Sequence, residues 1–208
     1  MPLNVRTLKV LAFVILSLPL AWLAFAVVGE LRSPGSMLGA DPGEAVLLHL
    51  GEWGLRALLL TLSVSTIRRR LGYAPILRVR RMAGLFAFTY IALHFLFYLW
   101  FFTEFDARLI VEELAERPYI TVGFGAFLIL LALALTSTNG WQRRLRRRWQ
   151  QLHRLVYVAA ALGILHFWWL TKAGYGEVVF HGFWLALLYA DRVQAAGAKR
   201  SRRSAQAT

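Results

Sequence analysis

Four long stretches without a charged side chain constrain this chain more than any other feature. They occupy positions 10–28, 82–102, 118–142 and 155–171. A helix needs about 20 mostly apolar residues to cross the roughly 30 Å hydrocarbon layer of a bilayer, and each stretch meets or approaches that length. A fifth segment, 45–67, is apolar except for Glu52 and Arg56, and a shorter sixth candidate lies at 178–190. The sequence therefore predicts an all-α, polytopic membrane helix bundle with six transmembrane helices.

The distribution of basic residues predicts how this bundle is oriented. If all six spans cross, 18 of the 24 Lys and Arg residues fall on one side of the membrane. They lie near the two chain ends, between the second and third spans, and between the fourth and fifth spans. The loops 29–44, 103–117 and 172–177 hold most of the acidic residues instead. Because positive charge stays on the cytoplasmic side of a membrane, both termini are predicted to lie inside (N-in, C-in) and these three loops outside.

Two features bear on the ends of the chain. Ala24, Phe25 and Ala26 resemble a signal-peptide cleavage site, but the 19 uncharged residues before and around them exceed the roughly 7–15 of a signal core, which favours an uncleaved anchor. Residues 195–208 are rich in Ala, Lys, Arg and Ser, a composition that predicts a disordered basic cytoplasmic tail after a single membrane domain over 1–194. No internal repeat is apparent.

Composition excludes several classes of protein. Of the 208 residues, 58% are hydrophobic, which is too apolar for an ordinary soluble domain. The absence of cysteine excludes disulfides, thiolate-bound iron–sulfur clusters and covalent c-type haem attachment. The net charge of +13 is concentrated at span ends, where it marks membrane topology, so we expect contact with lipid and no nucleic-acid partner.

Two of the five histidines lie deep inside predicted spans. His94 is about 18 Å along its helix from Met82, and His166 is about 25 Å along its helix from Trp149. Ionisable groups at such depth are rare, face the protein interior and mark functional sites. Both residues fall in the outer half of the membrane. They are therefore predicted to face each other as the two axial ligands of one haem iron, a role in which neutral imidazole is common.

His153 offers only half of a second site. It lies about 20 Å inward from His166 on the same helix, which suits a second redox group on the cytoplasmic side. Its counterpart on the span over 82–102 would be near Arg81, and no histidine occurs there. On an ideal helix His153 and His166 point roughly 140° apart, so both face one bundle interior only if the helix bends or overwinds.

The remaining polar groups in apolar segments have simpler interpretations. His49 and His181 lie near span ends, where hydrogen bonds to a neighbouring helix or to headgroups account for most histidines. Glu52 and Arg56 have the i, i+4 spacing of a helical ion pair and are expected to brace the bundle. The alternative is a contact to a cofactor carboxylate or to a quinone.

Four segments resemble the MsrQ (YedZ) family, which provides the haem-binding membrane subunit of a bacterial protein-methionine-sulfoxide reductase. They are RVRRMAGLFAFTYIALHF (78–95), RPYITVG (117–123), LALTSTNGWQRRLRRRWQQLHRLVY (133–157) and LHFWW (165–169). The resemblance covers most of 35–172 and implies a ferric-reductase-like transmembrane domain. It also implies cofactor-binding roles for His94, His153 and His166, with His94 and His166 as axial iron ligands, His153 as a possible second site and His49 as a weaker candidate.

The resemblance further implies a function. The chain would be a non-catalytic electron-transfer subunit in the bacterial inner membrane that carries b-type haem and FMN. It would pass electrons from the quinone pool, or from a cytosolic flavin reductase, to a periplasmic molybdopterin-containing methionine-sulfoxide reductase subunit, and so support the repair of oxidised periplasmic proteins.

Two other functions compete with this interpretation. A proton-conducting transporter can also use intramembrane histidines, and it would be colourless when purified. A stand-alone transmembrane ferric reductase would normally have an attached cytosolic dehydrogenase domain, and this sequence holds no G-x-G-x-x-G motif.

Overall fold

The computed structural model describes residues 4–206 as helices joined by turns and short loops. In chain order the helices are α1 (Val5–Arg32), α2 (Pro42–Leu71), η1 (Ala74–Arg78), α3 (Arg80–Phe101), α4 (Ala107–Glu116), α5 (Pro118–Leu135), α6 (Asn139–Leu145), α7 (Arg147–Leu152), η2 (His153–Leu155), α8 (Val156–Leu170) and α9 (Gly176–Ala205). No strand occurs among these residues, so the all-α prediction is confirmed.

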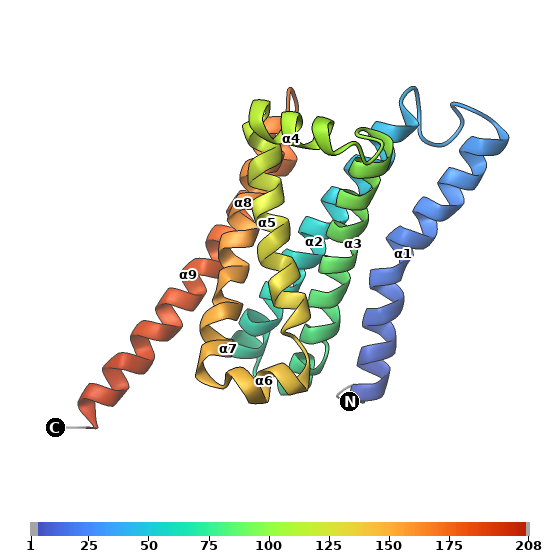
Figure 1. Cartoon of the computed structure of the whole chain (residues 1–208). Helices are drawn as coiled ribbons and strands as arrows, with labels where there is room; N and C mark the ends of the chain where they lie inside the picture. Colours follow the sequence, from blue (N-terminus) through green and yellow to red (C-terminus); the bar gives the residue numbers. More distant parts are fainter. Residues whose placement is uncertain (1–3, 207–208) are drawn as a thin grey trace.

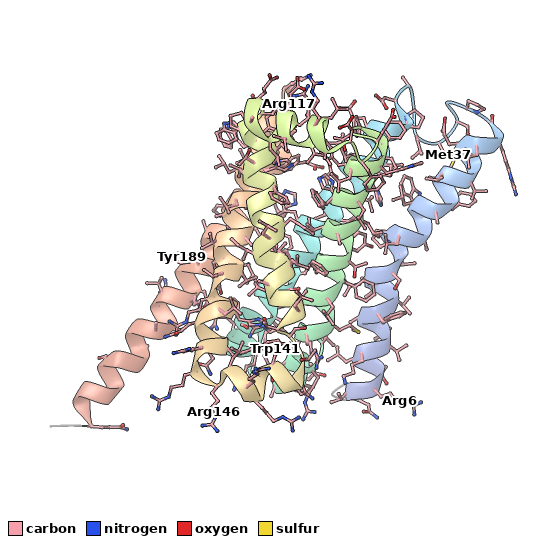
Figure 2. All side chains as sticks on the ribbon, in the orientation of Figure 1. Arg6, Met37, Arg117, Trp141, Arg146 and Tyr189 are labelled. Atoms are coloured by element: carbon pink, nitrogen blue, oxygen red, sulfur yellow. The ribbon has the colours of Figure 1, made fainter. Side chains whose placement is uncertain are left out.

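Two helix pairs form the centre of the bundle. Helix α2 packs along α3, and α5 packs along α8, while α1 and α9 flank this core on opposite sides (Figure 1). The short helices α4 and α6 lie across opposite ends of the bundle, here called the α4 end and the α6 end. Figure 2 shows Arg117 at the α4 end and Trp141 and Arg146 at the α6 end.

Five helical segments are long and apolar enough to cross a membrane. They are α1, α2, α3, α5 and the segment Arg147–Leu170, which comprises α7, η2 and α8. Helix α9 contains the predicted sixth span at 178–190 and runs from the α4 end to the α6 end (Figure 1), but it does not belong to this set, because Asp191, Arg192 and further basic residues follow its apolar half. The sixth crossing and the orientation of the bundle therefore stay predictions.

Two of the connections between long helices contain short helices. Helix α4 lies within 103–117 and begins at Asp106, whose carboxylate accepts the N–H of Arg108 at 2.7 Å. Helix α6 lies within 136–148 and begins after Thr138, whose hydroxyl accepts the N–H of Trp141 at 3.4 Å. Side chains of this kind satisfy the free N–H groups of a first helical turn, so each short helix has its own start signal.

Small side chains allow the central helices to approach closely. Ala57, Ala87, Ala159 and Ala160 are at most 1% exposed. In membrane bundles, where the hydrophobic effect does not drive helices together, such residues increase van der Waals contact between backbones.

Helix α1 contacts the bundle around Pro19. Proline lacks an N–H and displaces the preceding turn, which leaves nearby carbonyls in need of donors. The Tyr90 hydroxyl donates to the carbonyl oxygen of Leu16 at 2.7 Å, and His49 Nε2 lies 3.1 Å from the carbonyl oxygen of Pro19. A proline that would weaken an isolated helix thus becomes the attachment point of α1.

Helix α9 is held to α2 by a polar cluster toward the α6 end. The Asp191 carboxylate accepts from Thr66 Oγ1 and from Arg70 Nε, both at 2.9 Å, and also pairs with Arg69.

Beyond this cluster α9 continues to Ala205, through most of the segment 195–208 that was predicted to be disordered. Ala, Lys and Arg are good helix formers, which explains a helix in this composition. Residues 207 and 208 lie outside the described residues, and the division of the chain at residue 194 stays a prediction.

Candidate functional site

His94 and His166 come together at the α4 end of the bundle. His94 belongs to α3 and His166 to α8, and both are half-buried. Their ring centroids are 6.3 Å apart, and the ring planes are nearly perpendicular at 86°. The structure therefore brings together, from two separate helices, the two residues that were predicted to share one iron.

Each of these imidazoles is oriented by a main-chain carbonyl of the facing helix. His94 Nδ1 lies 2.9 Å from the carbonyl oxygen of Leu47 on α2, and His166 Nδ1 lies 2.7 Å from that of Tyr119 on α5. Because a carbonyl oxygen only accepts hydrogen bonds, Nδ1 carries the proton in both rings and Nε2 keeps its lone pair. A hydrogen bond at the ring nitrogen that does not bind the metal is the usual means by which proteins fix the tautomer and direction of a metal-binding histidine.

Two glycines let the rings reach those carbonyls. A Cβ added at Gly51 would lie 3.0 Å from His94 Nδ1, and one at Gly123 would lie 2.8 Å from His166 Nδ1. Real Cβ atoms are seldom found so close to a neighbour. Each glycine follows its carbonyl residue by one helical turn, at Leu47 and Tyr119 respectively, so a larger residue would push the imidazole away from its hydrogen bond.

The two halves of the site share one spacing along the chain. Histidine, glycine and carbonyl residue of the second half each lie 72 positions after their counterparts in the first half. The tripeptide Leu-His-Phe occurs at 93–95 and again at 165–167. The repeat is not apparent in the sequence because only these few positions coincide. A search for glycines at a constant distance before each deep histidine would have revealed it.

This arrangement fits an iron atom that already has other ligands. No group of three or more His, Cys, Asp or Glu side chains converges on a metal position anywhere in residues 4–206, so a bare ion would find only two protein ligands here. The macrocycle of a haem supplies four nitrogens and leaves two axial positions, for which histidine is common. An imidazole nitrogen binds a metal at about 2 Å, and rings whose centroids are 6.3 Å apart are compatible with one shared metal.

His153 lies toward the α6 end and has a different environment. Its ring stacks on Trp149 with centroids 3.9 Å apart, and its Nε2 lies 3.2 Å from Thr136 Oγ1. The Thr136 hydroxyl donates its own hydrogen to the carbonyl oxygen of Ala132 at 2.7 Å, so it accepts from His153 Nε2. The nitrogen that is left free in the other two histidines is therefore engaged in His153.

A cavity of about 240 Å³ lies beside His153. Arg80 and Arg81 of α3 line it together with His153, and Arg81 stands 72 positions before His153. The counterpart position near Arg81, where the sequence has no histidine, thus lines the same cavity as His153. The cavity is bounded by α2, α3 and α5 as well as by the segment of His153.

A tight turn explains how His153 and His166 both face the bundle interior. The three residues of η2, which begin at His153, wind about 120° per residue instead of about 100°. This overwinding reduces the angle between the two side chains from roughly 140° to about 80°. The helix between His153 and His166 is therefore overwound, as it must be if both side chains are to face one bundle interior.

His49, the weaker candidate, faces α1 instead of the pair. Its Nε2 lies 3.1 Å from the carbonyl oxygen of Pro19, and its ring stacks on Trp22 with centroids 5.0 Å apart.

The predicted pair of Glu52 and Arg56 is confirmed, with 3.0 Å between the charged atoms, and Glu177 of α9 joins it at 3.2 Å from the same guanidinium nitrogen.

A polar chain that no sequence pattern predicted connects α4 to the histidine pair. The Tyr98 hydroxyl donates to the Glu113 carboxylate at 3.0 Å, and Arg117 pairs with the same carboxylate at 3.1 Å. Arg117 also lies 3.4 Å from the hydroxyl of Tyr119, whose carbonyl orients His166. Residues of the segment 103–117 are therefore two contacts away from the site.

Comparison with known proteins shows the family of this chain. Residues 50–164 match the protein family described as ferric reductase like transmembrane component. The protein-methionine-sulfoxide reductase heme-binding subunit MsrQ of Herminiimonas arsenicoxydans is 43% identical over 210 residues, which cover 99% of this chain and 93% of that protein. The subunit with the same name from Xanthomonas campestris pv. campestris (strain 8004) is 44% identical over 175 residues, or 84% of this chain and 80% of that protein. This chain therefore belongs to the MsrQ family of ferric-reductase-like transmembrane proteins.

Proposed function

We propose that this chain is the membrane electron-transfer subunit of a protein-methionine-sulfoxide reductase in a bacterial inner membrane. In this proposal it carries b-type haem and FMN and receives electrons from the quinone pool or from a cytosolic flavin reductase. The acceptor is a periplasmic molybdopterin-containing subunit that reduces methionine sulfoxide in oxidised proteins. The α4 end is then the periplasmic end, with both termini inside.

The observation that carries the proposal is the pair of carbonyl-oriented imidazoles, His94 and His166. Both rings are held at Nδ1 by the same carbonyl-and-glycine arrangement, which leaves the lone pair of Nε2 available to a metal. A proton relay would benefit from rings free to rotate or to bond each other, whereas these rings are fixed at Nδ1. The arrangement supports axial ligation of one haem iron.

A bound haem would supply reversible one-electron chemistry at this position. The protein's own residues perform the remaining tasks. Leu47 and Tyr119 fix the tautomers through their carbonyls, and the apolar helices keep water away from the site, which influences its reduction potential. Helix α4 covers the same end of the bundle (Figure 1). His94 and His166, which would hold the haem, therefore lie near the surface that a periplasmic partner would approach.

We assign FMN to the cavity beside His153. Arg80 and Arg81 provide guanidinium groups, which form strong paired hydrogen bonds with phosphate. Trp149 and Phe88 provide ring surfaces in the same lining. The cavity lies toward the α6 end, where a cytosolic flavin reductase would deliver electrons. A second haem ligated by His153 is less well supported, because His153 Nε2 is engaged by Thr136.

The acidic segment around α4 is the proposed docking surface for the catalytic subunit. Glu112 and Glu116 are exposed and belong to no ion pair within the described part of the chain. Reversal of both charges to Lys should slow electron transfer to the partner most strongly at low ionic strength, because exposed charges steer association. Unchanged transfer at low salt would contradict docking at this surface.

The function is tested by spectroscopy of the purified protein. A reduced-minus-oxidised spectrum, a pyridine haemochrome assay and flavin quantitation should together find low-spin b-type haem and FMN. A colourless preparation with intact helical content would overturn the proposal.

A further inference from the structure

A groove of about 380 Å³ lies between α2 and α9 and shares no lining residue with either site described above. Rings from both helices line it: Trp53 from α2, and Phe180 and Trp184 from α9. Phe180 is 58% exposed, and α9 flanks the bundle (Figure 1), so the groove opens toward the surrounding lipid. A ligand that enters here must dissolve in the bilayer.

His181 lines this groove and has an unmet hydrogen-bonding need. Its side chain is 2% exposed, and its Nδ1 lies 2.6 Å from the carbonyl oxygen of Glu177. Its Nε2 is buried and has no hydrogen-bond partner among the described residues. Buried polar atoms without partners are rare, and each one calls for an explanation.

The tautomer of His181 identifies the chemistry of the missing partner. Since the Glu177 carbonyl can only accept, Nδ1 holds the proton and Nε2 is an acceptor. The partner must therefore be an O–H or N–H donor that reaches an apolar position lined by aromatic rings. A hydroquinone combines a planar ring, lipid solubility and two hydroxyl groups.

We propose that this groove is the oxidation site for hydroquinone and that His181 is its catalytic base. The inference rests on the electron-transfer function proposed above. As the hydroquinone becomes quinone, its two O–H bonds break. One proton goes to His181 Nε2, and the other goes to the Glu177 carboxylate, whose side chain is 58% exposed and can release it to water.

The two electrons leave one at a time to an oxidised b-type haem, the acceptor in the proposed function. They finally reduce a sulfoxide, which consumes two electrons and two protons and yields a thioether and water. The groove is close to that acceptor's ligands. The His181 ring lies edge-on to Phe167 with centroids 6.0 Å apart, and Phe167 follows His166 in the chain.

The charges beside the groove also favour release of protons from a bound hydroquinone. The Arg56 guanidinium contacts the carboxylates of Glu52 and Glu177 at 3.0 and 3.2 Å and lies 5.1 Å from the centroid of the Trp53 ring. Two carboxylates against one guanidinium leave a net negative charge beside the groove, which favours departure of protons from the ligand. Hydroquinone oxidation would thus occur toward the α4 end and not in the cavity beside His153.

Photolabelling tests the site without reference to haem. The full chain in lipid nanodiscs is illuminated with an azido derivative of a short-tailed ubiquinone, and the labelled peptides are identified by mass spectrometry. We expect label on the peptides that contain Trp53 and Phe180–Trp184, and we expect excess decylubiquinone to remove it. Label beside His153, or label that decylubiquinone does not displace, would overturn the proposal.

Rapid kinetics tests the role of His181. Reduction of the bound haem by decylubiquinol should slow about 100-fold in His181→Leu, the usual contribution of a catalytic base, while the haem spectrum and reduction by dithionite stay normal. Unchanged kinetics in a variant with a normal spectrum would overturn the proposal. Absence of haem from the wild-type protein would instead overturn the proposed function, and photolabelling would still decide the groove.

A matched pair on α9 keeps the test valid if His181→Leu does not fold. Phe180 lines the groove and is 58% exposed, whereas Phe183 is 63% exposed and does not line it. Phe180→Leu should weaken decylubiquinone binding about tenfold, because it removes one aromatic contact. Phe183→Leu should bind decylubiquinone as the wild type does, and equal effects of the two substitutions would contradict a site in the groove.

Discussion

At the α4 end of this bundle two imidazoles face each other, whereas at the α6 end one imidazole shares a cavity with two arginines. The chain spacing is the same at both ends, since His166 and His153 each have a counterpart 72 positions earlier, at His94 and Arg81. Only the chemistry differs. In the proposed function, the neutral pair at the α4 end binds iron and the arginines at the α6 end bind the anionic FMN.

The hydrogen bonds reinforce this difference. His94 and His166 are held at Nδ1, which leaves Nε2 for a metal. His153 is held at Nε2 by Thr136, and no glycine contact of the kind seen at Gly51 and Gly123 is found for it among the described glycines. A histidine in a membrane span is therefore not by itself a haem ligand, because the partner of its other nitrogen decides what it can bind.

The largest effect is expected from the axial ligands themselves. His94→Ala and His166→Ala should each abolish the low-spin haem spectrum, since one remaining imidazole leaves an axial position open. Leu93→Ala, at an exposed neighbouring position, is the matched control and should keep the spectrum. An intact low-spin spectrum in either histidine variant would refute the axial assignment.

A smaller effect is expected from the glycine contact on α5. In Gly123→Ala the new Cβ would lie 2.8 Å from His166 Nδ1, whereas a Cβ at Gly125 would have no neighbour within 4 Å. Gly123→Ala should lower haem affinity about 10- to 100-fold, as loss of an orienting partner does at metal sites. Gly125→Ala on the same helix should bind haem normally. The measurement is a haem titration of the apoprotein, and equal affinities would show that the close contact is unimportant.

At the α6 end, replacement of His153 should leave the haem spectrum unchanged. His153→Ala removes the ring that stacks on Trp149 and the hydrogen bond to Thr136, which together hold one wall of the cavity. FMN should therefore bind about tenfold more weakly, which corresponds to about 1.4 kcal/mol. The haem-to-protein ratio and the flavin content of the purified variant check both expectations. Loss of haem with retention of flavin would reverse the assignment of the two ends.

The smallest effect is expected from His49, which lies outside both regions. His49→Leu should lower the free energy of unfolding by about 1 kcal/mol, because the hydrogen bond to the Pro19 carbonyl is lost. Its haem spectrum should match that of the wild type. Thermal melting followed by circular dichroism measures the first quantity, and a changed spectrum would restore His49 as a ligand.

Features of this molecule that long stretches of sequence encode were predicted, whereas features that only a few residues encode were not. Long apolar segments predicted the first five spans, and depth along the helices predicted the meeting of His94 and His166, because both depend on rise per residue alone. Helices α4 and α6 were missed although Asp106 and Thr138 mark their starts, since they have 10 and 7 residues and are shorter than the windows of about 11–18 residues over which helical periodicity is read.

The supporting contacts of the site could not be predicted in the same way. Leu47 and Tyr119 act through their carbonyl oxygens, which every residue possesses, so their side chains carry no signal. The orphaned nitrogen of His181 depends on how α9 packs against α2, which the hydropathy of either helix does not reveal.

The proposed function rests above all on two imidazoles that share one iron. Near-infrared magnetic circular dichroism of the oxidised, purified protein reports the axial ligands of a low-spin haem. We predict a band characteristic of two histidine ligands, which is lost in both His94→Ala and His166→Ala. A high-spin haem, a haem with another ligand in place of one histidine, or a protein without haem would contradict the account.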